Sequence, residues 1–114
     1  IAVPQYSDYV TRSRRTDGQS TLLQMAQQLE RCYTQFSAYN KTSCAVVGTG
    51  GVSETSPEGY YVIAAAGSAL AASAFTLTAT PQGAQASNDS DCTTLTLTHL
   101  GVQGATGADT DSCW

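Results

Sequence analysis

The chain has 114 residues, four cysteines, one histidine and a net charge of −4. This length excludes two domains, because one domain usually needs roughly 100–200 residues. The lone histidine and the absence of a CxxC pair argue against a zinc site. The sequence GTGG at 48–51 lacks the ending of a phosphate-binding loop, and no nucleophile or metalloprotease motif occurs. We therefore expect no catalytic residues, no metal and no cofactor.

Residues 5–36 are predicted to form one long helix, because no proline occurs between Pro4 and Pro57. Its second half carries an apolar stripe with spacings of four and three residues. The stripe consists of Leu22, Ala26, Leu29, Tyr33 and Phe36, and Met25 and Cys32 broaden it. No large apolar residue lies between Thr11 and Thr21, so the N-terminal half is expected to project from the domain. Gly18 is expected to be a soft point where the two halves meet.

The hydrophobic period changes to two after Gly59, which predicts strands over 60–66, 75–80 and 93–100. Leucine and threonine alternate in the last two strands, so one face is apolar and the other carries hydroxyl groups. A short fourth strand is expected to begin near 102–103. The predicted fold class is α+β, with the helix covering one face of a three- or four-stranded antiparallel sheet.

The expected organisation is a single domain over 1–114. Residues 1–36 form the helix and 37–57 a helix-to-sheet loop. Residues 58–91 hold the first two strands, and 92–114 hold the third strand and a disulfide loop. The even number of cysteines and the few lysines indicate an oxidising compartment. Of the three possible pairings, Cys32–Cys44 and Cys92–Cys113 are favoured, because each closes a local loop.

The segments IAVPQYSDYVTRSRRTDGQSTLLQMAQQLERCYTQFSAY (1–39), GYYVIAAA (59–66), FTLTATPQGAQ (75–85) and DC…LTLT…G…CW (91–114) resemble type IV pilins. Within that family they are most similar to minor pilins of the PilE-like branch. The resemblance implies a structural, non-enzymatic subunit that helps to initiate and build the pilus, and it also implies roles in twitching motility and adhesion. A pilin of this kind is methylated at its N-terminus, lies in the inner membrane with a periplasmic head and later joins the extracellular fibre. Residues 1–3 would be the end of an apolar membrane and fibre-core helix, so we expect this truncated fragment to be monomeric.

Six residues of the first helical turns are expected to contact other pilins or lipid. They are Pro4, Tyr6, Tyr9, Arg12, Arg14 and Arg15. The tyrosines suit either a membrane interface or packing between helices, with an exposed helix end as the alternative. The arginines suit acidic partners, and a solvated helix face is the alternative. DNA is considered an unlikely partner, because three arginines without interleaved aromatic residues on an acidic protein are weak evidence. A ligand-binding pilin, either an adhesin or a DNA-uptake receptor, is the alternative function.

Three further features each have two interpretations. The acidic stretches 88–91 and 109–111 flank the favoured Cys92–Cys113 bridge, and they are either a calcium site or two solvated acidic turns. His99 is expected to be a half-buried structural residue. The hydroxyl face of the sheet could bind a glycan or a partner, but β-propensity alone explains its threonines.

Overall fold

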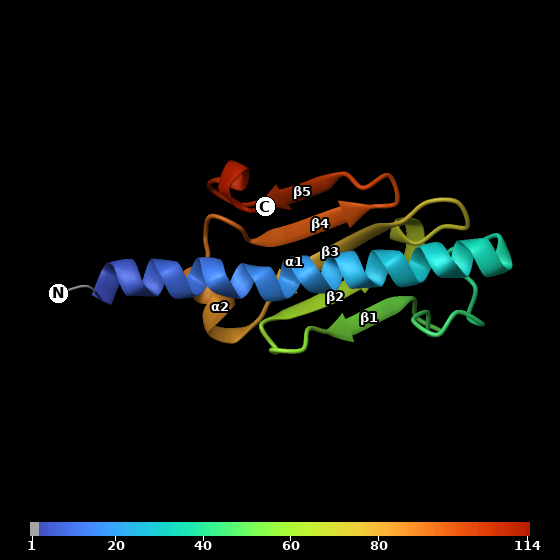
Figure 1. Ribbon diagram of the computed structural model, residues 1–114, viewed down its shortest axis with the longest axis horizontal. Coiled ribbons are helices and arrows are strands. Elements are labelled where there is room, and N and C mark those ends of the chain that lie inside the picture. The colour runs from blue at the N-terminus through green and yellow to red at the C-terminus, as the bar shows by residue number, and fades with distance from the viewer. Residues whose placement is uncertain (1–2) are drawn as a thin grey trace.

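The computed structural model describes residues 3–114, with side chains from Tyr9 onward. The expectation for residues 1–2 and the side-chain roles of Pro4 and Tyr6 therefore lie outside the described residues. A long helix, α1 (Val3–Phe36), crosses one face of a sheet and extends beyond it at the N-terminal end (Figure 1). The other elements are β1 (Val52–Thr55), β2 (Tyr61–Ala65), η1 (Gly67–Ala69), β3 (Thr76–Pro81), α2 (Gly83–Asn88), β4 (Thr94–Thr98), β5 (Gln103–Thr106) and η2 (Thr110–Ser112).

The five strands form an antiparallel meander in the order β1-β2-β3-β4-β5. Thr78 pairs with Thr96 and Thr76 with Thr98, so the threonines of β3 and β4 share one face. Leu77 opposite Leu97 lies on the other face, where both leucines are buried. The alternation of leucine and threonine thus specifies the register, because a slip by one residue would turn every leucine to solvent.

The core lies between α1 and the apolar face of the sheet. On α1 the buried apolar positions are Leu22, Met25, Leu29 and Cys32, with spacings of three and four. All four belong to the predicted stripe, but its other side is less buried than expected: Tyr33 is exposed, and Ala26 and Phe36 are only partly buried. Tyr61 and Ile63 of β2 are fully buried on the facing side. The α+β class and the one-sided cover are confirmed.

The structure corrects the predicted number of strands and two predicted loops. β1 lies inside the segment expected to be loop, and α2 lies in the connection between β3 and β4. β1 is an edge strand in which only Val52 is buried, so its sequence VSET shows no alternation of apolar and polar residues. β5 has the sequence QGAT, which is equally weak in pattern, and its start at Gln103 agrees with the short fourth strand expected near 102–103. Both edge strands are defined by pairing with their neighbours, which a local sequence period does not report.

Candidate subunit interface

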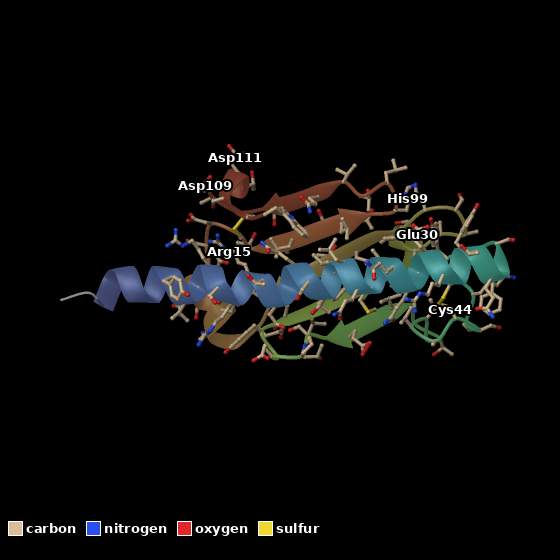
Figure 2. All side chains as sticks on the ribbon, in the orientation of Figure 1. Arg15, Glu30, Cys44, His99, Asp109 and Asp111 are labelled. Atoms are coloured by element: carbon tan, nitrogen blue, oxygen red, sulfur yellow. A yellow bond between two sulfur atoms is a disulfide. The ribbon has the colours of Figure 1, made fainter. Side chains whose placement is uncertain are left out.

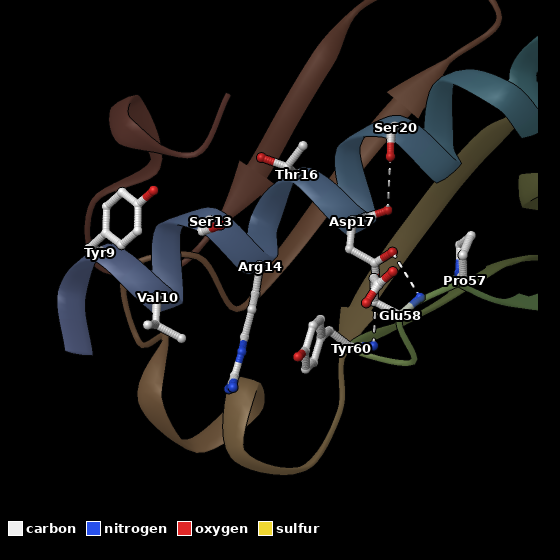
Figure 3. Close-up of a pocket in the computed structure, with 10 residues that line it drawn as sticks. All are labelled: Tyr9, Val10, Ser13, Arg14, Thr16, Asp17, Ser20, Pro57, Glu58 and Tyr60. Carbon is white, nitrogen blue, oxygen red and sulfur yellow. Dashed lines mark hydrogen bonds between the residues drawn. The ribbon is translucent and has the colours of Figure 1, made fainter. Parts of the chain in front are cut away.

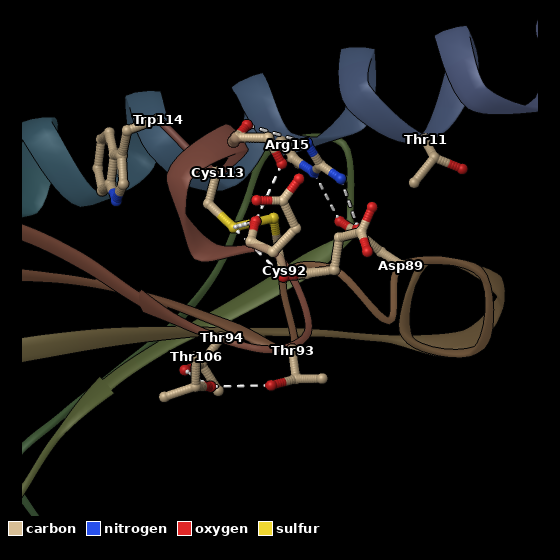
Figure 4. The surroundings of a disulfide bond; sticks show 12 residues. Thr11, Arg15, Asp89, Cys92, Thr93, Thr94, Thr106, Cys113 and Trp114 are labelled. Atoms are coloured by element: carbon tan, nitrogen blue, oxygen red, sulfur yellow. Dashed lines mark hydrogen bonds and ion pairs between the residues drawn. A yellow bond between two sulfur atoms is a disulfide. The ribbon is translucent and has the colours of Figure 1, made fainter.

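Arg15 does not belong to the exposed surface of the helix, because its side chain is buried in the head. Its Nε donates to Asp89 Oδ2 over 2.8 Å, and its Nη2 donates to Asp89 Oδ1 over 2.7 Å (Figure 4). Its Nη1 also donates to the carbonyl oxygen of Ser112 at 3.2 Å. The hydrogen bonds to Asp89 raise the pKa of Arg15 above its ordinary value. Arg15 therefore holds α1 to the disulfide loop and is unavailable to lipid or to another subunit.

Gln85 of α2 extends the same buried cluster. Its Nε2 donates to the carbonyl oxygen of Thr11 at 3.0 Å and to the hydroxyl of Tyr61 at 3.1 Å. Burial raises the pKa of Tyr61, so this hydroxyl stays protonated. These contacts begin at Thr11, one helical turn before Arg15. The expectation that α1 packs on the head only beyond Thr21 is therefore wrong.

Asp17 fixes the connection between β1 and β2 to the same part of α1. Its carboxylate accepts hydrogen bonds from the Ser56 hydroxyl, from the backbone N–H of Glu58 at 3.2 Å and from that of Tyr60 at 3.3 Å. Figure 3 shows this carboxylate reaching from the helix to the two backbone groups. Three donors satisfy a carboxylate that would be costly to bury alone. The polar middle of α1 thus packs against the head through hydrogen bonds, where the helix had been expected to project from the domain.

Sequence reasoning missed this polar contact, although one signal for it exists. Extending the buried stripe backward from Leu22 by four and then three residues leads to Gly18 and Arg15. Both residues are buried against the sheet side. An apolar criterion does not detect them, because one has no side chain and the other is charged. No local signal marks Asp17 or Gln85.

The predicted surface for contact with other pilins or lipid remains exposed only in part. We call this exposed part the stem and define it as residues 9–14 of α1. Tyr9 is 64% exposed, and Arg12 and Ser13 are also exposed. The guanidinium of Arg14 lies 4.5 Å from the ring centroid of Tyr60, a cation–π contact. Tyr9, Val10 and Arg14 line a groove of about 630 Å³ between the stem and the β1–β2 turn (Figure 3). Of the six predicted contact residues, Tyr9, Arg12 and Arg14 therefore remain accessible.

The two disulfides in the structure have the pairing that the sequence favours. Cys92–Cys113 spans 21 residues and closes the segment that holds β4, β5 and η2 (Figure 4). Cys32–Cys44 spans 12 residues and ties the last turns of α1 to the loop before β1. The C-terminal Trp114 donates from Nε1 to the carbonyl oxygen of Gly104 at 2.8 Å. The C-terminus is thus held against β5.

The acidic stretches flank Cys92–Cys113 but do not gather into a cation site. Asp89 is committed to Arg15, whereas Asp91, Asp109 and Asp111 are exposed. Over residues 3–114, no group of three acidic, cysteine or histidine side chains has the spacing of a metal site. Asp89 therefore fits neither interpretation, because it is buried in an ion pair, whereas the three exposed carboxylates suit solvated acidic turns.

His99 lies just after β4 and is half-buried, as expected. Its ring centroid lies 6.1 Å from that of Phe75 and 6.2 Å from that of Tyr39. The hydroxyl of Tyr39 donates to the carboxylate of Glu30, with distances of 2.9 and 3.1 Å to its two oxygens. Burial and this hydrogen bond raise the pKa of Tyr39 to about 12.

A family model described as type IV minor pilin ComP, DNA uptake sequence receptor, matches residues 4–96. The chain belongs to this family of type IV minor pilins. Solved structures agree. A type IV pilin from Shewanella oneidensis is 30% identical, with a TM-score of 0.57, and the match covers 82% of this chain and 89% of that one. The non-core minor pilin PilV from Neisseria meningitidis is 26% identical, with a TM-score of 0.59 and coverage of 89% and 91%. No curated protein gives a significant match.

Membership of this family confirms the predicted fold and the resemblance to minor pilins. Pilins are structural proteins, and minor pilins interact with other pilins in the pilus. Type IV pilins are membrane-anchored before they enter an extracellular fibre. Within residues 3–114 of this pilin, no helix combines the length and the apolar character needed to cross a membrane. The accessible stem and the edges of the head are therefore the surfaces to consider for contacts with other pilins.

Proposed function

We propose that this pilin is a non-enzymatic fibre subunit that contributes to assembly of the pilus, with its stem against neighbouring pilins and its head outward. Its head would lie in the periplasm before assembly and on the fibre afterwards, where it supports motility and adhesion. The observation that carries the proposal is the division of α1. Residues 15–32 are held against the head, whereas the side chains of Tyr9 and Arg12 are exposed. Exposed side chains on a helix that projects beyond the head are well placed to contact the helix of another pilin.

A DNA receptor is the second candidate, favoured by the description of the matching family model. The charge distribution of this chain argues against it. Residues 37–114 contain Lys41 against Glu54, Glu58, Asp89, Asp91, Asp109 and Asp111, which is 1 − 6 = −5. Arg15 is neutralised by Asp89, which leaves Arg12, Arg14, Arg31 and Lys41 to face phosphates. Proteins that bind duplex DNA by its backbone commonly use about 6–10 phosphate contacts.

The two candidates are separated by charge reversal on the stem. The variant Arg12→Glu/Arg14→Glu would be expressed as the full-length pilin in a strain that lacks the native copy. We expect loss of surface pili, or loss of this subunit from them, measured by shearing and immunoblotting. The control is Lys41→Glu, which reverses the charge of an exposed residue outside the stem.

Uptake of labelled DNA is measured in the same strains, and a gel shift with short duplex at low salt is measured with the purified chain. Normal piliation in Arg12→Glu/Arg14→Glu combined with failed DNA uptake would overturn the assembly proposal in favour of the DNA receptor. Tight, salt-sensitive binding of duplex by the wild-type chain would do the same. Arg15 is left unchanged, because its loss would disturb the head itself.

A further inference from the structure

Exposed large apolar side chains gather around one groove of the head. This hairpin groove has a volume of about 460 Å³ and lies between α1 and the turn that joins β4 to β5. Leu23, 45% exposed, lines it from α1. Leu100 and Val102, 76% and 57% exposed, flank Gly101, which lines it from the turn. Single exposed leucines are ordinary, but three aliphatic side chains around one groove indicate an interaction surface.

The turn holds its two aliphatic side chains outward in a fixed conformation. The hydroxyl of Thr98 accepts hydrogen bonds from the backbone N–H of Leu100 at 3.3 Å and of Val102 at 3.2 Å. The backbone N–H of Gly101 donates to the carbonyl oxygen of Thr98 at 2.9 Å, and the φ of Gly101 is +78°, which favours glycine. A turn ordered in this way loses little conformational entropy when a partner binds.

His99 adds an unsatisfied polar atom to the same groove. Its Nδ1 is buried and has no hydrogen-bond partner among the residues that the structure describes, although the residue itself is only half-buried. Buried polar atoms are nearly always hydrogen-bonded, so an atom left unpaired beside an open groove is consistent with a contact supplied from outside the chain. Figure 2 shows His99 on the turn and Glu30 on α1 at this end of the molecule.

The stem offers a matching apolar surface. Tyr9 and Val10 line the stem groove beside the β1–β2 turn, near one edge of the sheet. The hairpin groove lies near the opposite edge, which is formed by β4 and β5. The centres of the two sites are about 15 residues apart along α1, which is roughly 20 Å at the helical rise. Between parallel copies, a contact that joins two different patches at different heights is heterologous, and it builds a filament when the rotation does not close.

We propose that the hairpin groove receives the Tyr9/Val10 face of the stem of a neighbouring pilin that lies parallel to α1. This inference rests on the proposed fibre function and names the head surface that meets the stem. With Tyr9 and Val10 at the level of Leu23 and Ala26, the neighbour's Arg14 lies at the level of Glu30. The neighbour's Arg14 thus faces the exposed carboxylate of Glu30, and Arg31 lines the groove beside it. An apolar groove with a carboxylate at its end suits a stem that carries Tyr9, Val10 and Arg14, which selects a stem as the occupant.

A photo-crosslinking amino acid at position 100 tests this contact in assembled pili. The full-length pilin carrying p-benzoylphenylalanine in place of Leu100 is expressed in a piliated strain, the fibres are sheared off and irradiated, and adducts are mapped by mass spectrometry. We expect an adduct to another pilin within its first helical turns. The matched control replaces Thr80, which is exposed on the opposite face of the sheet. Adducts from position 100 that map elsewhere, or that equal those from position 80, would overturn the inference.

Charge placed on the turn provides a second test. Leu100→Asp/Val102→Asp should lower the amount of this pilin in sheared fibres to below about one tenth of wild type. Thr55→Asp, an exposed change on β1, should leave it unchanged. Wild-type incorporation of the double variant would contradict the inference. Absence of the wild-type chain from fibres would instead contradict the fibre function, so the two failures are distinguishable. Thermal unfolding of the purified variants reports whether the head is intact.

Discussion

Arg15 and Asp89 are separated by 74 residues in the chain and are almost completely buried together. Neither charge has another full counterion within this cluster, so each depends on the other. Removing one partner of a buried pair leaves an uncompensated charge, which usually costs about 3–5 kcal/mol. We expect Asp89→Ala to lower the free energy of unfolding by that amount, measured by urea denaturation of the purified chain.

Two further variants test whether the loss of stability in Asp89→Ala comes from the ion pair. Asp91→Ala removes an exposed carboxylate only two residues away and should change stability by less than about 0.5 kcal/mol. Arg15→Met/Asp89→Leu removes both charges, so it should recover much of the loss. Equal effects of Asp89→Ala and Asp91→Ala would show that the ion pair does not hold α1 to the disulfide loop.

Tyr39 should make the folding stability of the protein sensitive to alkaline pH. Burial first, and then its hydrogen bond to Glu30, raise the pKa of Tyr39 from 10.0 to about 12. Above the ordinary value the unfolded chain releases this proton while the folded chain retains it, so stability falls as the pH rises toward about 12. Tyr39→Phe cannot titrate. Its deficit at neutral pH, about 1–2 kcal/mol for the lost hydrogen bond, should therefore narrow over this range. Urea unfolding of both proteins at several alkaline pH values measures this, and a constant or growing deficit would contradict it.

At the scale of the element, Gly18 is a point of close packing where a soft point had been expected. A Cβ at this position would lie 2.9 Å from Cγ of the Tyr61 ring, which is fully buried. Alanine at an ordinary helical site gains about 1 kcal/mol over glycine. Here we expect Gly18→Ala to gain nothing and Gly18→Val to cost about 1–3 kcal/mol by overpacking.

The measurement for Gly18 is the midpoint of thermal or urea unfolding, with Ser13→Ala as the control on an exposed part of the same helix. That control should stay within about 0.5 kcal/mol of wild type. A clear stabilisation by Gly18→Ala would show that α1 does not lie tightly on Tyr61.

The sequence predicts well those elements in which buried apolar residues repeat at a regular spacing. β3 and β4 alternate leucine or alanine with threonine, and the second half of α1 repeats its apolar residues every three or four positions. β1 and β5 lack such a pattern, because an edge strand has one neighbour and little buried surface. Their existence depends on pairing with β2 and β4, which is a property of the assembled sheet.

The candidate interface was less predictable for a related reason. The residues RSRR at 12–15 suggest one basic surface, yet the helix directs Arg12 to solvent, Arg14 to Tyr60 and Arg15 into the head. Whether an arginine is buried depends on a partner far away in the sequence, here Asp89. The pairing of the cysteines was easier, because both bridges close local loops.

The whole molecule joins a slightly basic helix to an acidic remainder. Residues 1–36 contain four arginines against Asp8, Asp17 and Glu30, which is 4 − 3 = +1, whereas residues 37–114 carry −5. The molecule measures 55 × 23 × 19 Å, with α1 along the long axis. When such rods lie parallel, as in a fibre, complementary charge at different heights favours a staggered arrangement of neighbours.

This geometry predicts the behaviour of the 114-residue chain in solution. A stable pair usually buries at least about 1,200 Å², whereas the hairpin groove and the stem face each present only a few apolar side chains. One such contact is weak by itself and becomes significant only when many neighbours act together in a fibre. We therefore expect a single species of 11.9 kDa in sedimentation velocity, with no change between low and moderate salt.

Leu100→Asp/Val102→Asp distinguishes the possible origins of any association. If a dimer forms and the double variant abolishes it, the hairpin groove is stronger than its size suggests, and the expectation of a monomer is wrong while the contact itself stands. If a dimer persists in the double variant, its interface lies elsewhere on the head. A dimer that dissociates as salt increases would point to the stem and the acidic head, because ionic screening acts over about 10 Å at 0.1 M.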